Sequence, residues 1–470
     1  MTESARKDLR SPKNKDGLVS QSTSEDGTTT GMAQKEAGLA RPVELDIAVS
    51  HFMADAYDTY ADLRAKGPVS RLRFAGGEEE SGDGEESREF FFRNETYFVT
   101  HYNEAIATLL DDRFSADPRS GMSEEQLEQQ PPMPEELRPL SRSIHLLDPP
   151  NHTRLRKLVQ PSFTGRGMQA LRGNIQQIAD DFLDKAERDA AERGEATPDR
   201  QMDLIKTFAY PFPITVISDM LGIPREDRET IRGWKENLMS ADRLWGREMD
   251  EETRAGLREF IDYLQDLFER KRRAPTDDMI SRLVHAEEDG DVLDGDEVLS
   301  MVFLMFLAGH VTTVNLIVNG VVALLTHPDQ LAKLKANTEL AKGVVEETLR
   351  YWGPIDFIGR RIAKEDVEVG GTVIPSGERA TVGLAAANRD PARFANPDIF
   401  DITRADANRH VAFGKGIHVC LGAPLARVEG QVAFGTLFRR FPELRLAVPA
   451  EELRWRASFL RGFARLPVLF

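Results

Sequence analysis

The chain almost lacks cysteine, because Cys420 is the only one among 470 residues. A single thiol excludes an internal disulfide framework and is typical of a reducing cytoplasm, where we expect the protein to be located. Positive charge is also scarce: 61 Lys and Arg residues stand against 78 Asp and Glu residues, a formal net charge of -17. Bulk nucleic-acid binding needs a positive surface, so we expect no nucleic-acid partner.

The first 40 residues contain no apolar stretch of signal-peptide length. Residues 1–42 are rich in small polar and charged residues, which predicts a disordered N-terminal tail. We expect residues 43–470 to form a single domain. The acidic run at residues 78–89 lies between two strand-like segments, Val69–Phe74 and Phe90–Val99, and is interpreted as a surface insertion in a hairpin.

One stretch, Val298–Leu325, is apolar enough to raise the question of a membrane span. It also carries hydroxyl, amide and imidazole side chains, which would be costly against lipid. These are Ser300, His310, Thr312, Thr313, Asn315 and Asn319. We therefore expect a buried helix and no membrane span.

Helical periodicity dominates residues 100–355. The predicted helices are Tyr102–Leu110, Ile175–Arg193, Arg228–Met239, Glu251–Arg272 and Glu297–Thr326. Asp294 and Glu297 form a candidate cap for the last of these, and His327-Pro328 a stop. Strand signals are fewer, at Tyr97–Thr100, Val367–Ile374, Arg379–Val382 and the C-terminal tail. The pattern predicts a mainly α fold with small β-sheets (α+β).

The sole cysteine lies in the sequence Phe-Gly-Lys-Gly-Ile-His-Val-Cys-Leu-Gly, residues 413–422. A lone cysteine is usually a small buried hydrophobe, and two glycines are usually a turn. Here a helix is expected to begin near Leu421, which places the sulfur beside free amides that favour the thiolate. Zinc is the metal alternative for Cys420 and His418, but it would need further Cys or His ligands nearby.

This loop resembles the haem-binding loop of the cytochrome P-450 family, Phe-Gly-x-Gly-x-His/Arg-x-Cys-x-Gly, at all six fixed positions. The resemblance implies the cytochrome P-450 fold, with the long central helix crossing the haem. It also implies haem b (iron protoporphyrin IX), with Cys420 as axial iron ligand and Phe413 and His418 as haem contacts. A thiolate ligand pushes electron density toward cleavage of a bound O–O bond.

Other segments match the family in the expected chain order. Glu347 and Arg350, three apart on one helix face, would normally be a surface ion pair of little energy. The family has such a pair behind the haem, completed by an arginine that Arg404 matches, with a structural role. Four further residues match contacts to the haem propionates, which basic side chains bind by charge-assisted hydrogen bonds: His152, Arg156, Arg361 and His410.

Ala308 and Gly309 precede Thr312 within the long apolar helix. Small residues there permit close helix packing, or else a groove above the iron with the Thr312 hydroxyl bonded to dioxygen or water. The family usually has an acidic residue before this threonine for proton delivery, and here it is Val311. Protons are then expected to come through Thr312, water or another group, with His310 a candidate by proximity.

Two further segments match the family's substrate pocket, which is expected to be mainly apolar. With the long helix they supply the candidate lining residues Leu304, Ile355, Asp356, Phe357 and Phe459. Asp356 is interpreted either as an anchor for an amine or hydroxyl, or as a solvent-facing residue. The chain has no flavin or nicotinamide module, so electrons are expected from a ferredoxin and its reductase. Arg154, Lys157 and Lys415 form the candidate docking patch.

The predicted function is a haem-thiolate monooxygenase that hydroxylates or epoxidises a sizeable apolar small molecule with dioxygen. The sequence looks most like bacterial hydroxylases of macrolides and other polyketides. Terpenoids, steroids and fatty acids remain open as substrates. The alternatives are a peroxygenase driven by hydrogen peroxide, which the absence of the acid at Val311 suggests, and a haem-thiolate sensor or binding protein without turnover.

Overall fold

The computed structural model describes residues 43–48, 56–75, 95–128, 134–138, 142–195, 200–228, 230–231, 233–234, 250–288, 290–456 and 460–470. The predicted tail and the acidic insertion at residues 78–89 lie outside these residues, as does most of the predicted helix Arg228–Met239.

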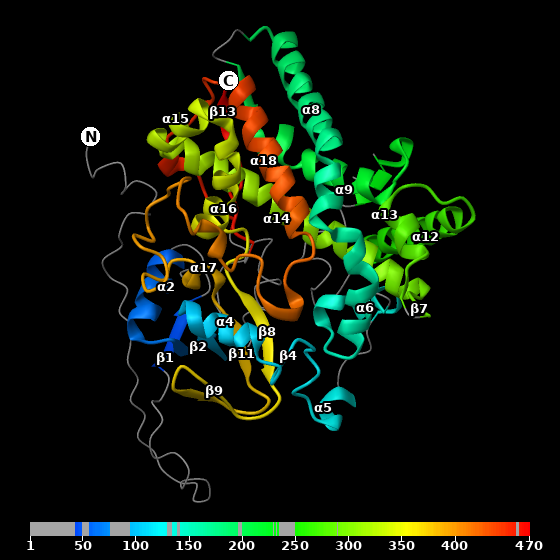
Figure 1. Ribbon diagram of the computed structural model, residues 1–470, viewed down its shortest axis with the longest axis vertical. Helices are drawn as coiled ribbons and strands as arrows, with labels where there is room; N and C mark the ends of the chain where they lie inside the picture. The colour runs from blue at the N-terminus through cyan, green and yellow to red at the C-terminus, as the bar shows by residue number, and fades with distance from the viewer. Residues whose placement is uncertain are drawn as a thin grey trace, which may run out of the picture.

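Helices make up most of the described chain (Figure 1). They are α2 (Ala56–Lys66), α4 (Tyr102–Leu110), α5 (Glu124–Glu128), α6 (Asn151–Val159), α7 (Gly165–Ala170), α8 (Arg172–Glu192), α9 (Pro211–Leu221), α12 (Glu251–Arg273), α13 (Met279–Val284), α14 (Gly295–Thr326), α15 (Pro328–Ala336), α16 (Ala341–Trp352), α17 (Leu384–Ala387) and α18 (Ala423–Arg440). The helices predicted near residues 102, 175, 251 and 297 are confirmed, with ends within three residues of those expected.

The strands form small sheets. They are β1 (Val43–Ala48), β2 (Val69–Ala75), β3 (Thr96–Val99), β4 (Phe114–Ser115), β5 (Gln201–Asp203), β6 (Glu287–Glu288), β7 (Asp291–Val292), β8 (Ile358–Ala363), β9 (Val367–Val369), β10 (Thr372–Ile374), β11 (Arg379–Val382), β12 (Arg445–Leu446) and β13 (Pro467–Leu469). The largest sheet has the order β1-β2-β3-β11-β8-β4. β2 and β3 pair antiparallel, as expected for the two arms of the predicted hairpin.

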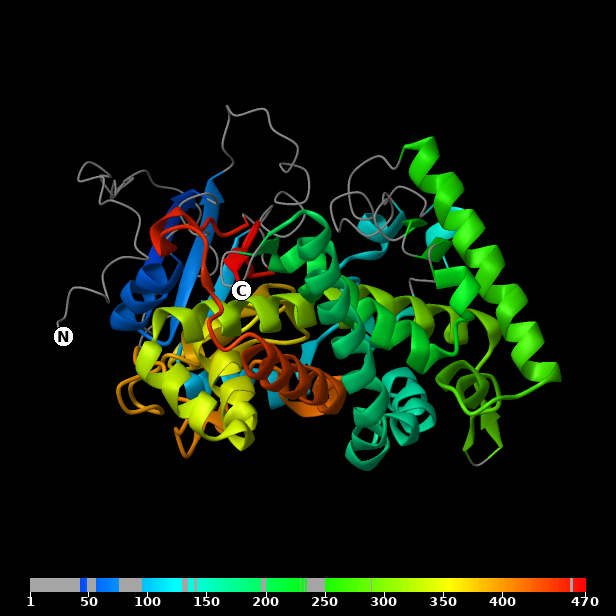
Figure 2. The same cartoon turned by 90° about the horizontal axis from the view of Figure 1, so that it is seen from above.

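Helix α14 runs across the molecule, as the yellow-green helix of Figure 2 shows, and packs against α9, α16 and α18. Its start is confirmed: the Asp294 carboxylate accepts from the Glu297 amide at 2.8 Å, and the Glu297 side chain accepts from the Asp294 amide at 3.0 Å. By length and composition α14 is apolar enough to cross a membrane. However, 67% of its most apolar 18-residue window is buried inside the structure, which is expected of a core helix.

In Figure 1 the helices α8, α14, α16 and α18 lie together in the upper part, and the largest sheet lies below them with α2 and α4 against it. The main hydrophobic core joins α8, α9, α14, α16 and α18, and a smaller core lies between α4 and the sheet. The cysteine loop, residues 413–422, connects these regions, since it touches α4 on one side and leads into α18 on the other.

Candidate active site

Two glycines give the cysteine loop its shape. Gly414 and Gly416 have φ of 70° and 77°, in the left-handed region that residues with a Cβ avoid. A Cβ on Gly416 would also lie 2.7 Å from the Leu109 carbonyl oxygen of α4. The Cys420 amide donates to the Phe413 carbonyl at 2.9 Å and closes the loop. The absence of a side chain at Gly416 therefore lets the loop lie against the backbone of α4.

Cys420 is exposed at the end of this loop, three residues before α18 begins at Ala423. Desolvation by the surrounding protein raises the pKa of its thiol. The amides of Gly422 and Ala423 and the charges of Arg156 and Arg427 lower this pKa, but by less. The amides at the helix start thus lower the pKa of the Cys420 thiol, as the sequence predicted. Full ionisation of this thiol also needs a bound metal ion.

Helix α14 has one open face in its middle. Leu304, Leu307 and Val311 are half-buried there, Ala308 is exposed, and most of the rest of the helix is buried. The Thr312 hydroxyl lies on this face and donates its only proton to the Ala308 carbonyl at 2.6 Å, which leaves its oxygen free to accept. A small residue and a hydroxyl on one face are what the sequence predicted for the groove.

His310 lies elsewhere. It is fully buried on the side of α14 that packs against Tyr210, with its Nε2 2.7 Å from the Tyr210 carbonyl oxygen and the two rings edge to face at 4.4 Å. This packing does not bring the imidazole to the open face. His310 was expected at the site because it is close to Thr312 in the sequence. Two residues along a helix, however, turn a side chain by about 200° around the helix axis, so the two side chains lie on different faces.

Basic side chains with unmet hydrogen-bonding capacity gather near the loop. His152 and His418 have ring centroids 4.4 Å apart, and the His152 Nδ1 is buried with no partner among the described residues. Arg361 is 7% exposed, and its guanidinium makes no hydrogen bond or ion pair within the described chain. Desolvation, followed by the charges of Arg361, His152, His145 and Arg156, lowers the pKa of His418 to about 3.

Such a cluster suits an anion, because the buried Arg361 is a cation without an ion pair to any described residue and the imidazoles beside it can donate hydrogen bonds. The two propionates of haem supply that charge, so His152, Arg361 and His418 fit the group that the cysteine loop implies. Arg156 donates to the Val419 carbonyl at 3.0 Å and so also supports the loop. The neighbouring His145, which the sequence analysis missed, belongs to the same electrostatic cluster.

The structure does not bring His410 to this cluster. Its Nε2 is 3.1 Å from Glu346 Oε2, and its Nδ1 accepts from the Ala412 amide at 3.1 Å, so both ring nitrogens have protein partners. Zinc has no support either, since no group of three or more His, Cys, Asp or Glu side chains suited to a metal ion occurs in the described residues.

Glu347 and Arg350 form a buried pair, with two N–H···O bonds of 2.8 Å and both side chains 0% exposed. Arg404 completes it, 3.3 Å from Glu347 Oε1. Arg350 also donates to the carbonyls of Asn388, Pro397 and Ile399. These bonds connect α16 to the backbone that leads to the cysteine loop, in agreement with the predicted structural role and not with a surface ion pair.

Asp356 is fully buried and accepts from Arg461 Nε at 2.8 Å and from Tyr60 Oη at 3.1 Å. This geometry contradicts both predicted roles, because the carboxylate neither faces solvent nor has capacity left for a substrate. The sequence does not show this pairing, because Asp356 and Arg461 lie 105 residues apart.

The other predicted pocket residues are placed differently. Leu304 lies on the open face of α14, and Ile355 is half-buried and bridges to Leu460. Phe357 is 5% exposed and packs in a core cluster with Phe98, which removes it from any pocket lining. Phe459 lies outside the described residues.

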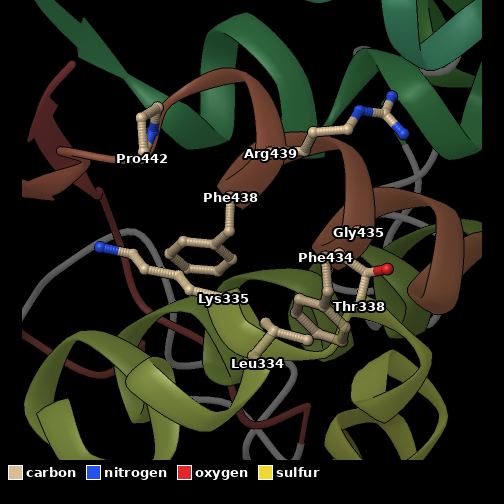
Figure 3. Close-up of a pocket in the computed structure, with 8 residues that line it drawn as sticks. All are labelled: Leu334, Lys335, Thr338, Phe434, Gly435, Phe438, Arg439 and Pro442. Atoms are coloured by element: carbon tan, nitrogen blue, oxygen red, sulfur yellow. The ribbon is translucent and has the colours of Figure 1, made fainter.

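A groove of about 280 Å³ lies between α15 and α18 and contains none of the predicted site residues. Figure 3 shows that its two cationic side chains, Lys335 and Arg439, point away from each other. Their charges therefore do not converge on one ligand.

The cytochrome P450 family profile matches residues 119–448. The chain belongs to the cytochrome P450 family. It is a monooxygenase with haem as its cofactor. Cytochrome P450 monooxygenase PikC of Streptomyces venezuelae is 41% identical over 433 residues, covering 91% of this chain and 95% of the relative. Polyketide biosynthesis cytochrome P450 PksS of Bacillus subtilis (strain 168) is 43% identical over 373 residues, covering 79% and 88%.

The fold agrees with this family. The structure of a myxobacterial cytochrome P450, CYP267B1, in complex with myristic acid superposes with a TM-score of 0.76 at 37% identity, covering 89% of this chain and 97% of the other. The cytochrome P450 fold predicted from the cysteine loop is confirmed.

We predict that Glu347→Gln destabilises the haem-loaded P450 by about 3–5 kcal/mol, since it leaves Arg350 buried without its charge partner. Urea unfolding followed by the Soret band and by far-UV circular dichroism measures this. The control is Lys342→Met, on the same helix as Glu347, which removes an exposed ion pair with Glu339. It should change the free energy of unfolding by under about 1 kcal/mol. Equal effects of the two changes would contradict the structural role of Glu347.

Proposed function

We propose that this P450 hydroxylates or epoxidises a sizeable apolar small molecule of the polyketide or macrolide type, with dioxygen and with electrons from a ferredoxin and its reductase. One oxygen atom enters the C–H or C=C bond, and the other leaves as water after two electrons and two protons are supplied. The proposal rests on the restrained loop that carries Cys420, together with the open, apolar face of α14 that holds Thr312.

Haem bound through Cys420 supplies the oxygen chemistry. The chain positions what reacts: Leu304, Leu307 and Val311 present an apolar surface that favours an apolar substrate and disfavours water. His152, Arg361 and His418 hold the propionate edge, and Arg156 holds the loop that carries the sulfur. The polyketide class is supported by PksS, whose name places it in polyketide biosynthesis, while the fatty acid bound by CYP267B1 keeps the fatty-acid class as the next candidate.

The expected result is product formation that requires dioxygen, reduced ferredoxin and the thiol of Cys420. Cys420→Ser should remove the red-shifted Soret band of the reduced carbon monoxide complex and abolish turnover. Candidate polyketides, macrolides and fatty acids are ranked by their shift of the haem Soret band. Product formed from hydrogen peroxide alone at an equal rate would establish the peroxygenase alternative, and substrate binding without any product would establish a sensor.

A buried carboxyl offers a proton source that the sequence analysis missed. Glu429 of α18 is 1% exposed and lies next to Thr313 of α14, the residue after Thr312. Desolvation by burial raises the pKa of Glu429 well above its usual range, which favours the protonated carboxyl. A protonated acid at this position provides a donor where Val311 provides none.

We predict opposite effects on coupling, the fraction of reductant that ends in product. Val311→Glu should raise coupling because it adds an acid on the open face, and Glu429→Gln should lower it because the amide cannot release a proton. Product and hydrogen peroxide are measured per NADPH consumed. Glu368→Gln on β9, an exposed residue, is the control. Unchanged coupling in both variants would exclude this proton source.

Two of the three basic residues that the sequence offered for ferredoxin docking remain candidates. Arg154 is paired with Asp291 and Glu297, so its charge is already compensated. Lys157 on α6 and Lys415 in the cysteine loop are exposed and make no ion pair with described residues. Exposed apolar side chains at Leu110, Ile417 and Val419 lie around the same loop. An apolar centre with a cationic rim suits an acidic carrier.

We predict that Lys157→Glu and Lys415→Glu each slow reduction of the haem by reduced ferredoxin, with the effect largest at low ionic strength. Stopped-flow kinetics under carbon monoxide measure the rate. Lys335→Glu on α15, the same charge change in the groove of Figure 3, should leave the rate unchanged. A rate that is the same in all three variants would refute this docking site.

A further inference from the structure

A second carboxylate on α16 contacts the cysteine loop independently of Glu347. Glu346 Oε1 accepts from Arg427 Nε at 2.6 Å, and Glu346 Oε2 accepts from Arg427 Nη2 at 3.1 Å. The His410 Nε2 lies 3.1 Å from the same Oε2. One carboxylate therefore joins α16, the start of α18 and the segment just before Phe413.

The charge of this cluster follows from its hydrogen bonds. His410 Nδ1 accepts from the Ala412 amide and so carries no proton, which makes Nε2 the N–H that donates to Glu346. His410 is then neutral. Burial opposes ionisation of Glu346, but the hydrogen bonds from His410 and Arg427 outweigh it and lower its pKa to about 2. The cluster holds one negative and one positive charge.

Arg427 is the cationic member of the cluster that packs on the cysteine loop. It lies about one turn into α18, which begins at Ala423, and its guanidinium carbon is 4.7 Å from the centre of the Phe413 ring. Phe413 is the residue whose carbonyl closes the loop on the Cys420 amide. The guanidinium of Arg427 therefore packs directly against the loop that carries the sulfur, and its positive charge lies beside that loop.

We propose that Glu346 and Arg427 are positioning residues that set the electrostatic potential at the Cys420 sulfur and, through it, the reduction potential of the haem iron. Reduction from ferric to ferrous adds one electron, and a net positive charge nearby favours the state that has gained it. Glu346 offsets the charge of Arg427 and keeps the iron harder to reduce than Arg427 alone would make it. His410 orients the carboxylate without adding charge.

The test is the midpoint potential of the haem-loaded protein, measured by spectroelectrochemistry in Glu346→Gln, Arg427→Gln and the double variant. Glu346→Gln should shift the potential to more positive values, and Arg427→Gln to more negative values. The double variant should return close to the parent. A role in folding alone predicts shifts of one sign for both single variants, accompanied by loss of haem or of the thiolate spectrum.

Two controls separate charge from geometry. Arg439→Gln removes an exposed arginine near the far end of α18 and should leave the potential unchanged. Arg427→Lys keeps the charge and should stay near the parent value. Shifts of equal sign in the two single variants, no shift in either with the thiolate spectrum intact, or an Arg427→Lys shift as large as that of Arg427→Gln would each overturn the proposal.

Discussion

The position of one sulfur atom is the constraint on which the site depends. Cys420 is carried by a loop rather than by a helix or strand. A loop holds a fixed geometry only when its neighbours restrain it. Here three elements do so: α4 against Gly416, Arg156 of α6 on the Val419 carbonyl, and Glu346 of α16 through Arg427 and His410. The loop is thus rigid because of its surroundings.

Buried charge performs much of this restraint. The Glu347, Arg350 and Arg404 cluster satisfies six backbone carbonyl bonds between residues 388 and 399, in a segment that lacks regular secondary structure. Replacing such a cluster with apolar side chains would leave those carbonyls without donors. The buried charges therefore cost desolvation energy, but they provide the donors that hold an irregular segment in place before the cysteine loop.

The features that the sequence predicted well are local. The capping box of α14 and the bounds of β11 depend on residues close together in the chain, so the local sequence pattern predicts them directly. The predictions that failed needed knowledge of partners far away. Asp356 meets Arg461 and Tyr60, and Phe357 meets Phe98, across more than 100 residues. Glu346 was overlooked beside Glu347 for the same reason, since its partners lie 64 and 81 residues further on.

The net charge of the whole chain does not predict the local charge around the cysteine loop. A formal charge of -17 describes the whole chain, yet three arginines, Arg156, Arg361 and Arg427, lie around the cysteine loop. These cations differ in whether a carboxylate is paired with them. Arg361 is a buried cation that makes no ion pair with a described carboxylate, while His152 and His418, whose pKa values are lowered, add hydrogen-bonding groups rather than charge. Arg427 on the sulfur side has Glu346. A cation left unpaired there would act on the thiolate directly, so local pairing, and not the sum over the chain, determines the field at the iron.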